Sequence, residues 1–253
     1  MPSNDRLKTV FITGAGKRLG RAMALYFGKM GWNVGVHFSS SYDGANQVVK
    51  MIDQIGEITN GQRGIALRAD VRSKAQLESA FDACTRHFGA PPDVLVNNAG
   101  IFPPPAPISK ITRASWDEVF SVNVAGEFVA AQLFSAIAPE NARIINISSL
   151  GGLEVWNNRL PYNVSKSAVI HLTKALAREL APKISVNCIC PGAISMPNEP
   201  SVSDASMIAP ARIPMQRHGS AEDVCEAVYF FATCTQYITG QILTVDGGYH
   251  DAR

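Results

Sequence analysis

Residues 10–20 read Val-Phe-Ile-Thr-Gly-Ala-Gly-Lys-Arg-Leu-Gly, a short apolar strand that leads through a glycine-rich turn into a helical pattern. Glycines have no Cβ to block close approach of a ligand to the backbone, and the unpaired N–H groups of a helix start attract an anion. The stretch therefore predicts a phosphate-binding turn at the start of an α/β fold. Its glycine spacing is neither the common G-x-G-x-x-G pattern nor that of a P-loop.

Apolar runs of strand length alternate with helical periods along the chain. We expect strands near residues 8–12, 33–38, 64–68, 93–96, 142–147, 183–189 and 241–245, and helices near 19–30, 43–56, 73–88, 116–138, 160–180 and 221–233. This alternation predicts an α/β fold, a Rossmann-type doubly wound parallel sheet of about seven strands with helices on both faces. No linker or repeat interrupts residues 1–253, which we expect to form a single domain.

A tyrosine and a lysine, Tyr162 and Lys166, lie four residues apart on one of the expected helices. This spacing places both side chains on the same face, so the lysine charge favours the ionised form of the phenol, whose ordinary pKa is about 10. Such a tyrosine can pass a proton to or from a substrate oxygen. Ser149 ends a strand and can donate a hydrogen bond to the same oxygen. Taken alone, this pair is more typical of an ordinary helix surface.

The set of motifs resembles the short-chain dehydrogenases/reductases from residue 8 to about residue 249. The matching motifs, in order, are the glycine turn, Asp70-Val71, Asn97-Asn98-Ala99-Gly100, Asn123, Ser149, Tyr162 with Lys166, and Pro191-Gly192. The resemblance implies hydride transfer to or from a nicotinamide dinucleotide at the carboxyl edge of the sheet. It also implies that Lys166 contacts the nicotinamide ribose and that Asn123 holds a water linking Lys166 to solvent.

The catalytic residues implied are Asn123, Ser149, Tyr162 and Lys166. The cofactor residues implied are Gly14, Lys17, Arg18, Leu19, Gly20, Phe38, Ser39, Ser40, Ser41, Asp70, Val71, Asn98, Ala99, Gly100, Tyr162, Lys166, Pro191, Gly192 and Ile194. The substrate residues implied are Arg18, Phe102, Ser149 and Tyr162.

The cofactor is predicted to be NADP(H). An acid after the second strand would bind the ribose 2′-hydroxyl of NAD and repel a 2′-phosphate. Phe38 stands where NAD-preferring members of the family usually carry Asp, and three serines follow at residues 39–41. With Lys17 in the glycine turn, these hydroxyls suit a phosphate. An ordinary polar loop is the alternative for residues 39–41.

Two hypotheses about the substrate remain. Arg18 in the turn and Phe102 after the Asn-Asn-Ala-Gly motif, together with His37-Phe38 and the C-terminal residues 237–249, resemble pteridine reductases. In those enzymes the arginine and an aromatic at the position of Phe102 contact a planar pterin. Those enzymes carry Asp where this chain has Ser149, and a serine suits a carbonyl. We therefore favour reduction of a small-molecule or acyl-thioester carbonyl, with dihydropterin reduction as the alternative. A non-catalytic NADP-binding regulatory protein is a third hypothesis, which retention of Tyr162 and Lys166 disfavours.

Residues 195–219 are weakly periodic and rich in Pro, Ser and Met. In a fold of this kind we expect such a segment to form a lid on the substrate side, the alternative being a disordered insertion. The segment would set the identity of the substrate, which the sequence does not name.

Composition narrows the partners. With 23 Lys and Arg against 21 Asp and Glu the formal charge is +2, so no nucleic-acid partner is expected. No run of eighteen apolar residues and no signal-peptide core is present, so we expect no membrane partner and a cytoplasmic location. The five cysteines are expected to be free thiols, and no metal site is predicted. The resemblance implies a homo-oligomer, usually a tetramer and possibly a dimer, paired through helices 116–138 and 160–180.

Overall fold

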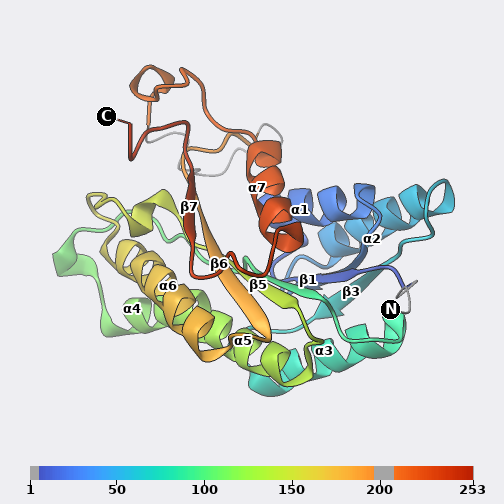
Figure 1. The fold of residues 1–253 in the computed structure, drawn as a ribbon. Coiled ribbons are helices and arrows are strands. Elements are labelled where there is room, and N and C mark those ends of the chain that lie inside the picture. Colours follow the sequence, from blue (N-terminus) through green and yellow to red (C-terminus); the bar gives the residue numbers. More distant parts are fainter. Residues whose placement is uncertain (1–5, 197–207, 253) are drawn as a thin grey trace.

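The computed structural model describes residues 6–196 and 208–252. In these residues, seven strands form one parallel sheet in the order β3-β2-β1-β4-β5-β6-β7 (Figure 1). The strands are β1 (Thr9–Ile12), β2 (Asn33–Phe38), β3 (Gly64–Arg68), β4 (Val94–Asn97), β5 (Ala142–Ile147), β6 (Ile184–Pro191) and β7 (Ile242–Val245). The strand order reverses between β1 and β4, the kind of switch point at which open α/β sheets bind ligands.

Helices cover both faces of the sheet, which confirms the predicted doubly wound α/β fold (Figure 1). One layer contains α1 (Arg18–Lys29), α2 (Tyr42–Glu57) and α7 (Ala221–Thr233), and the other contains α3 (Lys74–Phe88), α4 (Arg113–Phe120), α5 (Gly126–Ile137) and α6 (Leu160–Glu179). Short 3₁₀ turns lie at Ile108–Lys110, Leu150–Gly152 and Pro210–Arg212.

The alternation of side chains along β1 divides the core into two clusters. Val10 and Ile12 face the layer of α1, α2 and α7, whereas Phe11 faces the other layer and stacks on Phe81 with ring centroids 4.3 Å apart. Successive strand residues point to opposite faces, so both sides of a parallel sheet covered by helices must be apolar. This requirement explains why the strands could be recognised as continuous apolar runs.

The expected single helix over residues 116–138 differs in one respect. α4 and α5 are joined by a π-helical turn (Ser121–Ala125), so the helical run extends from Arg113 to Ile137. By length and composition alone this run could cross a membrane, but Val119, Ala130 and Phe134 along it are buried in the protein. We interpret it as a core helix whose widened turn accommodates the buried Asn123.

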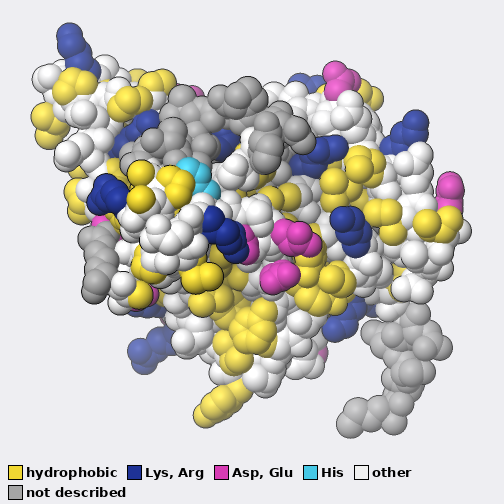
Figure 2. Space-filling model, turned by 90° about the horizontal axis from the view of Figure 1, so that it is seen from above, with side chains coloured by type: hydrophobic (Ala, Val, Ile, Leu, Met, Phe, Trp, Pro, Cys, Tyr) yellow, Lys and Arg dark blue, Asp and Glu magenta, His cyan; other side chains and the backbone are white. Residues whose placement is uncertain are grey.

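The segment that follows β6, which includes most of the expected lid, begins at the carboxyl edge of the sheet. Of the expected lid, residues 197–207 lie outside the described residues; Ile208 and Ile213 pack in a small cluster with Leu150 and Tyr249. Figure 2, viewed toward this side of the molecule, shows basic and acidic side chains interspersed with hydrophobic ones.

The five cysteines are free thiols, and among the residues that the structure describes, no cluster of His, Cys, Asp or Glu could hold a metal ion.

Candidate active site

The glycine turn is closed by contacts that leave no space for larger residues. Gly14 has a φ of +67°, and a Cβ on Gly20 would overlap the carbonyl oxygen of Gly14. The Asn98 amide donates to the carbonyl oxygens of Thr13 and Gly14 at 2.9 and 3.2 Å, which ties the turn to the end of β4. The sequence around residues 13–20 therefore folds so that the backbone itself lines the site.

His37, which sequence analysis did not assign to the cofactor site, fixes the same turn from β2. Its Nδ1 accepts a hydrogen bond from the Gly14 N–H at 3.1 Å, so the ring proton lies on Nε2. Burial lowers the pKa of His37 to about 4, and the ring is therefore neutral at physiological pH. A charged imidazolium could not accept this hydrogen bond.

The start of α1 has no side-chain cap. Lys17 is the N-cap residue, and its side chain makes no capping hydrogen bond. The first turn of the helix therefore directs its N–H groups and its positive dipole end at the adjacent cavity, which suits an anion. Arg18 follows with a φ of +49°, a left-handed conformation unusual outside glycine.

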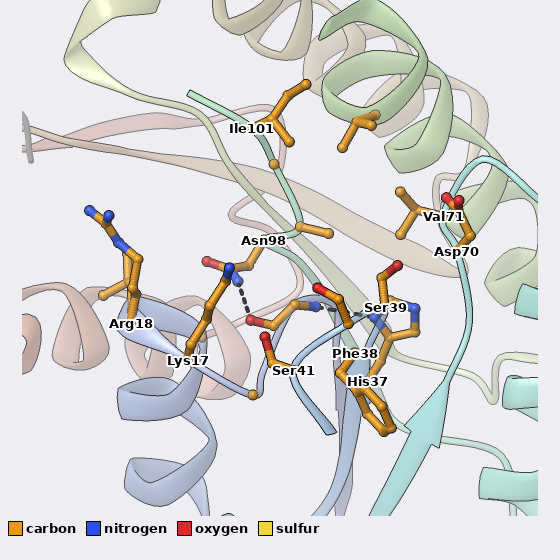
Figure 3. A pocket seen from close by; sticks show the side chains of 18 of the residues that line it. Lys17, Arg18, His37, Phe38, Ser39, Ser41, Asp70, Val71, Asn98 and Ile101 are labelled. Atoms are coloured by element: carbon orange, nitrogen blue, oxygen red, sulfur yellow. Dashed lines mark hydrogen bonds between the residues drawn. The ribbon is translucent and has the colours of Figure 1, made fainter. Parts of the chain in front are cut away.

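A cavity of about 380 Å³ opens beside this helix start (Figure 3). Lys17, Ser39 and Ser41 lie around one part of it, with Asp70 and Val71 on another side. Phe38 belongs to the wall, but its side chain is 4% exposed and packs in the core, with its ring centroid 5.9 Å from that of Tyr42. The position thus carries no acid, and the buried ring of Phe38 is not available to contact a ligand.

Besides Lys17 and Arg18, the wall of this cavity contains a third cation, Arg72, which sequence analysis did not assign. Its guanidinium binds the Asp70 carboxylate through both oxygens at 2.5–3.0 Å, and this contact lowers the pKa of Asp70. The Asp70 charge is thus largely matched by Arg72. The position of Arg72, two residues after the predicted Asp70, was the available signal.

A second cavity of about 570 Å³ contains the predicted catalytic side chains Ser149, Tyr162 and Lys166. The Ser149 Oγ accepts a hydrogen bond from the Gly151 N–H at 3.1 Å. The hydroxyl proton of Ser149 therefore remains available for donation to another acceptor. Since Ser149 is only 2% exposed, that acceptor would meet it in a largely dehydrated site.

Two aromatic side chains contact the ring of Tyr162. The Phe102 ring contacts it edge-on at a centroid distance of 4.5 Å, and Trp156 lies nearly parallel to it at 6.3 Å. The Arg159 guanidinium lies 4.0 Å from the Phe102 centroid and donates to the carbonyl oxygen of Pro103. One face of Phe102, the predicted stacking residue, is therefore already covered.

Lys166 lies in the wall of the catalytic cavity, and Asn123 lies behind that wall. The Lys166 Nζ donates to the Ile147 carbonyl oxygen at 2.7 Å and lies 3.6 Å from Glu127 Oε1. Asn123, in the π turn, lies in the wall of neither cavity; its side chain binds Ile101 and Ser165. The structure thus brings Ser149, Tyr162 and Lys166 together and places Asn123 behind them.

The remaining predicted residues divide between the cavities. The first contains Gly14, Lys17, Arg18, Leu19, Gly20, Phe38, Ser39, Ser40, Ser41, Asp70, Val71, Asn98, Ala99 and Gly100. The second contains Phe102, Ser149, Tyr162, Lys166, Pro191, Gly192 and Ile194. The six residues in both walls are Lys17, Arg18, Leu19, Asn98, Gly100 and Ile101, so the two hollows are adjacent along one sheet edge. The walls of the two cavities also contain residues that sequence analysis did not assign to the site: Gly16, His37, Arg72, Ile101, Glu118, Val122, Ile147, Ser148 and Met196.

Comparison with known proteins decides the family. The model of a family described as enoyl-(acyl carrier protein) reductase matches residues 14–250. The chain belongs to the short-chain dehydrogenase/reductase family. This assignment confirms the resemblance inferred from the ordered motifs and makes the protein a member of a family of oxidoreductases.

Two relatives illustrate the range of the family. The chain is 37% identical over 251 residues to 3beta-hydroxysteroid dehydrogenase 1 of Eggerthella lenta, covering 95% of this chain and 93% of that protein. It is 33% identical over 248 residues to the 3-oxoacyl-[acyl-carrier-protein] reductase FabG of Staphylococcus epidermidis, covering 95% and 98%.

Solved structures of short-chain dehydrogenases/reductases have the same architecture. A dehydrogenase/reductase from Sinorhizobium meliloti is 34% identical with a TM-score of 0.87, and the match covers 96% of this chain and 95% of that one. A short-chain dehydrogenase from Burkholderia cenocepacia, solved in complex with NADP, is 31% identical with a TM-score of 0.86, over 96% and 98%.

Proposed function

We propose that the protein is an NADP(H)-dependent oxidoreductase that reduces a carbonyl group of a small molecule or an acyl thioester. The observation that carries the proposal is the adjacency of the two cavities. A molecule bound along the glycine turn and the end of β4 would extend from the first cavity to Ser149, Tyr162 and Lys166 in the second. When bound, the cofactor supplies the hydride.

The residues of the first cavity fit a dinucleotide with a 2′-phosphate. The uncapped start of α1 suits the pyrophosphate, and Gly14 and Gly20 keep the turn free of Cβ atoms. The Ser39–Ser41 hydroxyls with Lys17 suit the extra phosphate, and β2 ends in Phe38 instead of an acid. The NADP-bound relative from Burkholderia cenocepacia supports this choice.

Each catalytic side chain has a distinct role in the proposal. Tyr162 donates its phenolic proton to the substrate oxygen, and the Ser149 hydroxyl donates a hydrogen bond to the same oxygen as negative charge develops there. The Lys166 ammonium favours the tyrosinate that remains after proton transfer. Asn123 fixes the Ile101 loop against α6 and so maintains the depth of the cavity.

The proposed substrate carries a carbonyl because Ser149 is a neutral donor that stabilises an oxyanion. The names of the two curated relatives, a 3-oxoacyl carrier-protein reductase and a hydroxysteroid dehydrogenase, are consistent with this chemistry. Dihydropterin reduction remains the second candidate because Arg18 and Phe102 lie in the wall of the same cavity. Arg159 over one face of Phe102 reduces the surface on which a pterin could stack.

We further propose a soluble cytoplasmic homo-oligomer that binds neither nucleic acid nor membrane. Phe128 on α5 and Val164 on α6 are 45% and 38% exposed, which suits burial against a second copy of the chain. Light scattering coupled to size exclusion would measure the assembly. A monomer at micromolar concentration would contradict this part of the proposal.

The test of the proposed activity compares Tyr162→Phe with Tyr26→Phe, a control on α1 outside both cavities. NADPH oxidation would be followed with small ketones, diketones and β-ketoacyl thioesters. We expect Tyr162→Phe to lower turnover by about 10²–10⁴ while changing NADPH affinity only a few-fold. Full activity of this variant would refute the mechanism. Absence of turnover by the unaltered protein, with NADPH still bound, would favour the regulatory alternative.

A further inference from the structure

Glu127 is a buried acid that the proposed mechanism does not use. It lies in the first turn of α5, directly after the π turn, and its side chain is 2% exposed. Within the described residues neither carboxylate oxygen has a hydrogen-bond partner, and Lys166 Nζ lies 3.6 Å from Oε1, an ion-pair distance beyond hydrogen-bond range. A carboxyl group placed without hydrogen bonds in the interior is costly, so its position needs an explanation.

Among the residues that the structure describes, one charged group, Lys166, lies within ion-pair distance of Glu127. From β4, the Asn97 amide donates to the Glu127 carbonyl oxygen at 3.3 Å and to the neutral Asn146 side chain of β5 at 3.0 Å. From β6, the buried Cys188 thiol interacts with Glu127, and its pKa is raised by its contact with Cys190 and by burial. The same contact lowers the pKa of Cys190, which also interacts with Lys166. α3 buries only Leu77, Ala80, Phe81 and Cys84 against this layer. Lys166 on α6 is therefore the ionic partner.

The Glu127 carboxyl group can change its protonation state in mildly alkaline solution. Burial raises the pKa of Glu127 to about 8, and the nearby Lys166 charge opposes this rise. With the proton present, Lys166 acts on its surroundings with its full charge. With the proton lost, the carboxylate offsets that charge at 3.6 Å, in a site with little water to screen either group.

Lys166 transmits this difference to the catalytic cavity. It lies in the cavity wall with Tyr162, one helical turn further along α6. Resting on the oxidoreductase mechanism proposed above, we propose that Glu127 is a positioning residue that acts through Lys166: its carboxylate offsets the lysine charge and so keeps the phenol of Tyr162 protonated, and able to donate, in mildly alkaline solution. Glu127 itself lines neither cavity and acts only through its ion pair with Lys166.

The test uses Glu127→Gln, which preserves shape and removes the charge. Tyrosinate absorbance would be titrated without cofactor or substrate in the unaltered protein and in the variant, each compared with its Tyr162→Phe counterpart to isolate the signal of Tyr162. We expect Tyr162 to ionise at a pH lower by about half a unit or more in Glu127→Gln, because a negative charge near Lys166 is lost. Glu140→Gln, an exposed acid after α5, is the matched control and should leave the titration unchanged.

Infrared spectroscopy supplies a second readout of the same proposal. A protonated-carboxyl band that disappears in Glu127→Gln should titrate near the pKa of Glu127, about 8. If Glu127→Gln does not fold, Glu127→Leu is used: removing one member of a buried ion pair lowers stability, but the Lys166 Nζ keeps its hydrogen bond to the Ile147 carbonyl oxygen. Unchanged ionisation of Tyr162 in the folded variant would overturn the proposal. A shifted titration in a protein without reductase activity would uphold it while refuting the proposed function.

Discussion

Replacement of Asn123 by alanine tests whether this residue serves the site as a clamp. Asn123 is fully buried in the π turn. Its Oδ1 accepts from the Ile101 N–H at 2.8 Å, and its Nδ2 donates to the Ile101 carbonyl oxygen at 3.0 Å and to the Ser165 Oγ at 3.1 Å. One side chain thus satisfies both backbone groups of Ile101 and connects the β4 loop to α6.

The magnitude follows from what the substitution leaves behind. Asn123→Ala removes the side-chain partner of both the Ile101 N–H and the Ile101 C=O. Each such group left unsatisfied costs about 1–3 kcal/mol when buried, and the lower end applies here because Ile101 is only half-buried. The vacated volume adds about 1 kcal/mol unless the turn collapses. We therefore expect the free energy of unfolding to fall by about 3 kcal/mol, a large part of the roughly 5–15 kcal/mol of a typical domain.

The assay is urea unfolding at equal protein concentration, combined with steady-state kinetics. Ser121→Ala, in the same π turn, removes only a local bond to the Glu118 carbonyl oxygen and should cost less than about 1 kcal/mol. A loss below about 1 kcal/mol for Asn123→Ala, accompanied by loss of turnover, would refute the clamp. It would indicate instead that Asn123 serves proton transfer directly, as the family resemblance implies.

Three further predictions concern the cofactor, the substrate and acid stability. Ser39→Asp should weaken NADPH binding at least about tenfold with an unchanged melting temperature, whereas Phe38→Asp should also lower that temperature because the ring is buried; calorimetry and thermal melts measure both. The unaltered protein should reduce carbonyl substrates faster than dihydropterins in a side-by-side NADPH-depletion assay, and Ser149→Asp should narrow that difference. Arg217 and the Ser220 N–H lower the pKa of Asp223, so the ionised carboxylate stabilises the fold above about pH 4, and this stabilisation is lost as the pH falls. Asp223→Asn should therefore lower the free energy of unfolding by about 1 kcal/mol or less at pH 7. It should also reduce the difference between the melting temperatures at pH 7 and pH 3.

The elements of the fold could be predicted largely because the five inner strands, β2, β1, β4, β5 and β6, are buried on both faces. In β1, for example, Val10, Phe11 and Ile12 form an apolar run, and the strand ends where Thr13 and Gly14 follow. The π turn at Ser121–Ala125 could not be predicted in this way. One extra residue in a turn changes the helical period too little to be seen over so short a segment.

The site could be predicted where a short sequence motif carries its chemistry, as in the glycine turn and at Tyr162 and Lys166. His37 was missed because a histidine within an apolar strand is usually a core residue, and only the structure shows its Nδ1 accepting from Gly14. Glu127 was missed because acids on helices are usually solvated. Its position four residues after Asn123, on the buried side of an apolar helix, was the signal available.

The π turn joins these observations, since it places two polar side chains against α6 from a helix that is otherwise apolar on its buried side. Asn123 contacts Ser165, and Glu127, one turn after Asn123, lies 3.6 Å from Lys166. Two adjacent residues of α6 thus contact two adjacent turns of the same helical run. A widened turn has weaker internal hydrogen bonds than a regular α-helix, and the three bonds of Asn123 offset that weakness. If the clamp is removed, α5 should relax toward regular geometry and move Glu127 relative to Lys166. Asn123→Ala should therefore also change the pH at which Tyr162 ionises, although Asn123 carries no charge. An unchanged tyrosinate titration in a folded Asn123→Ala protein would show that the two residues act independently.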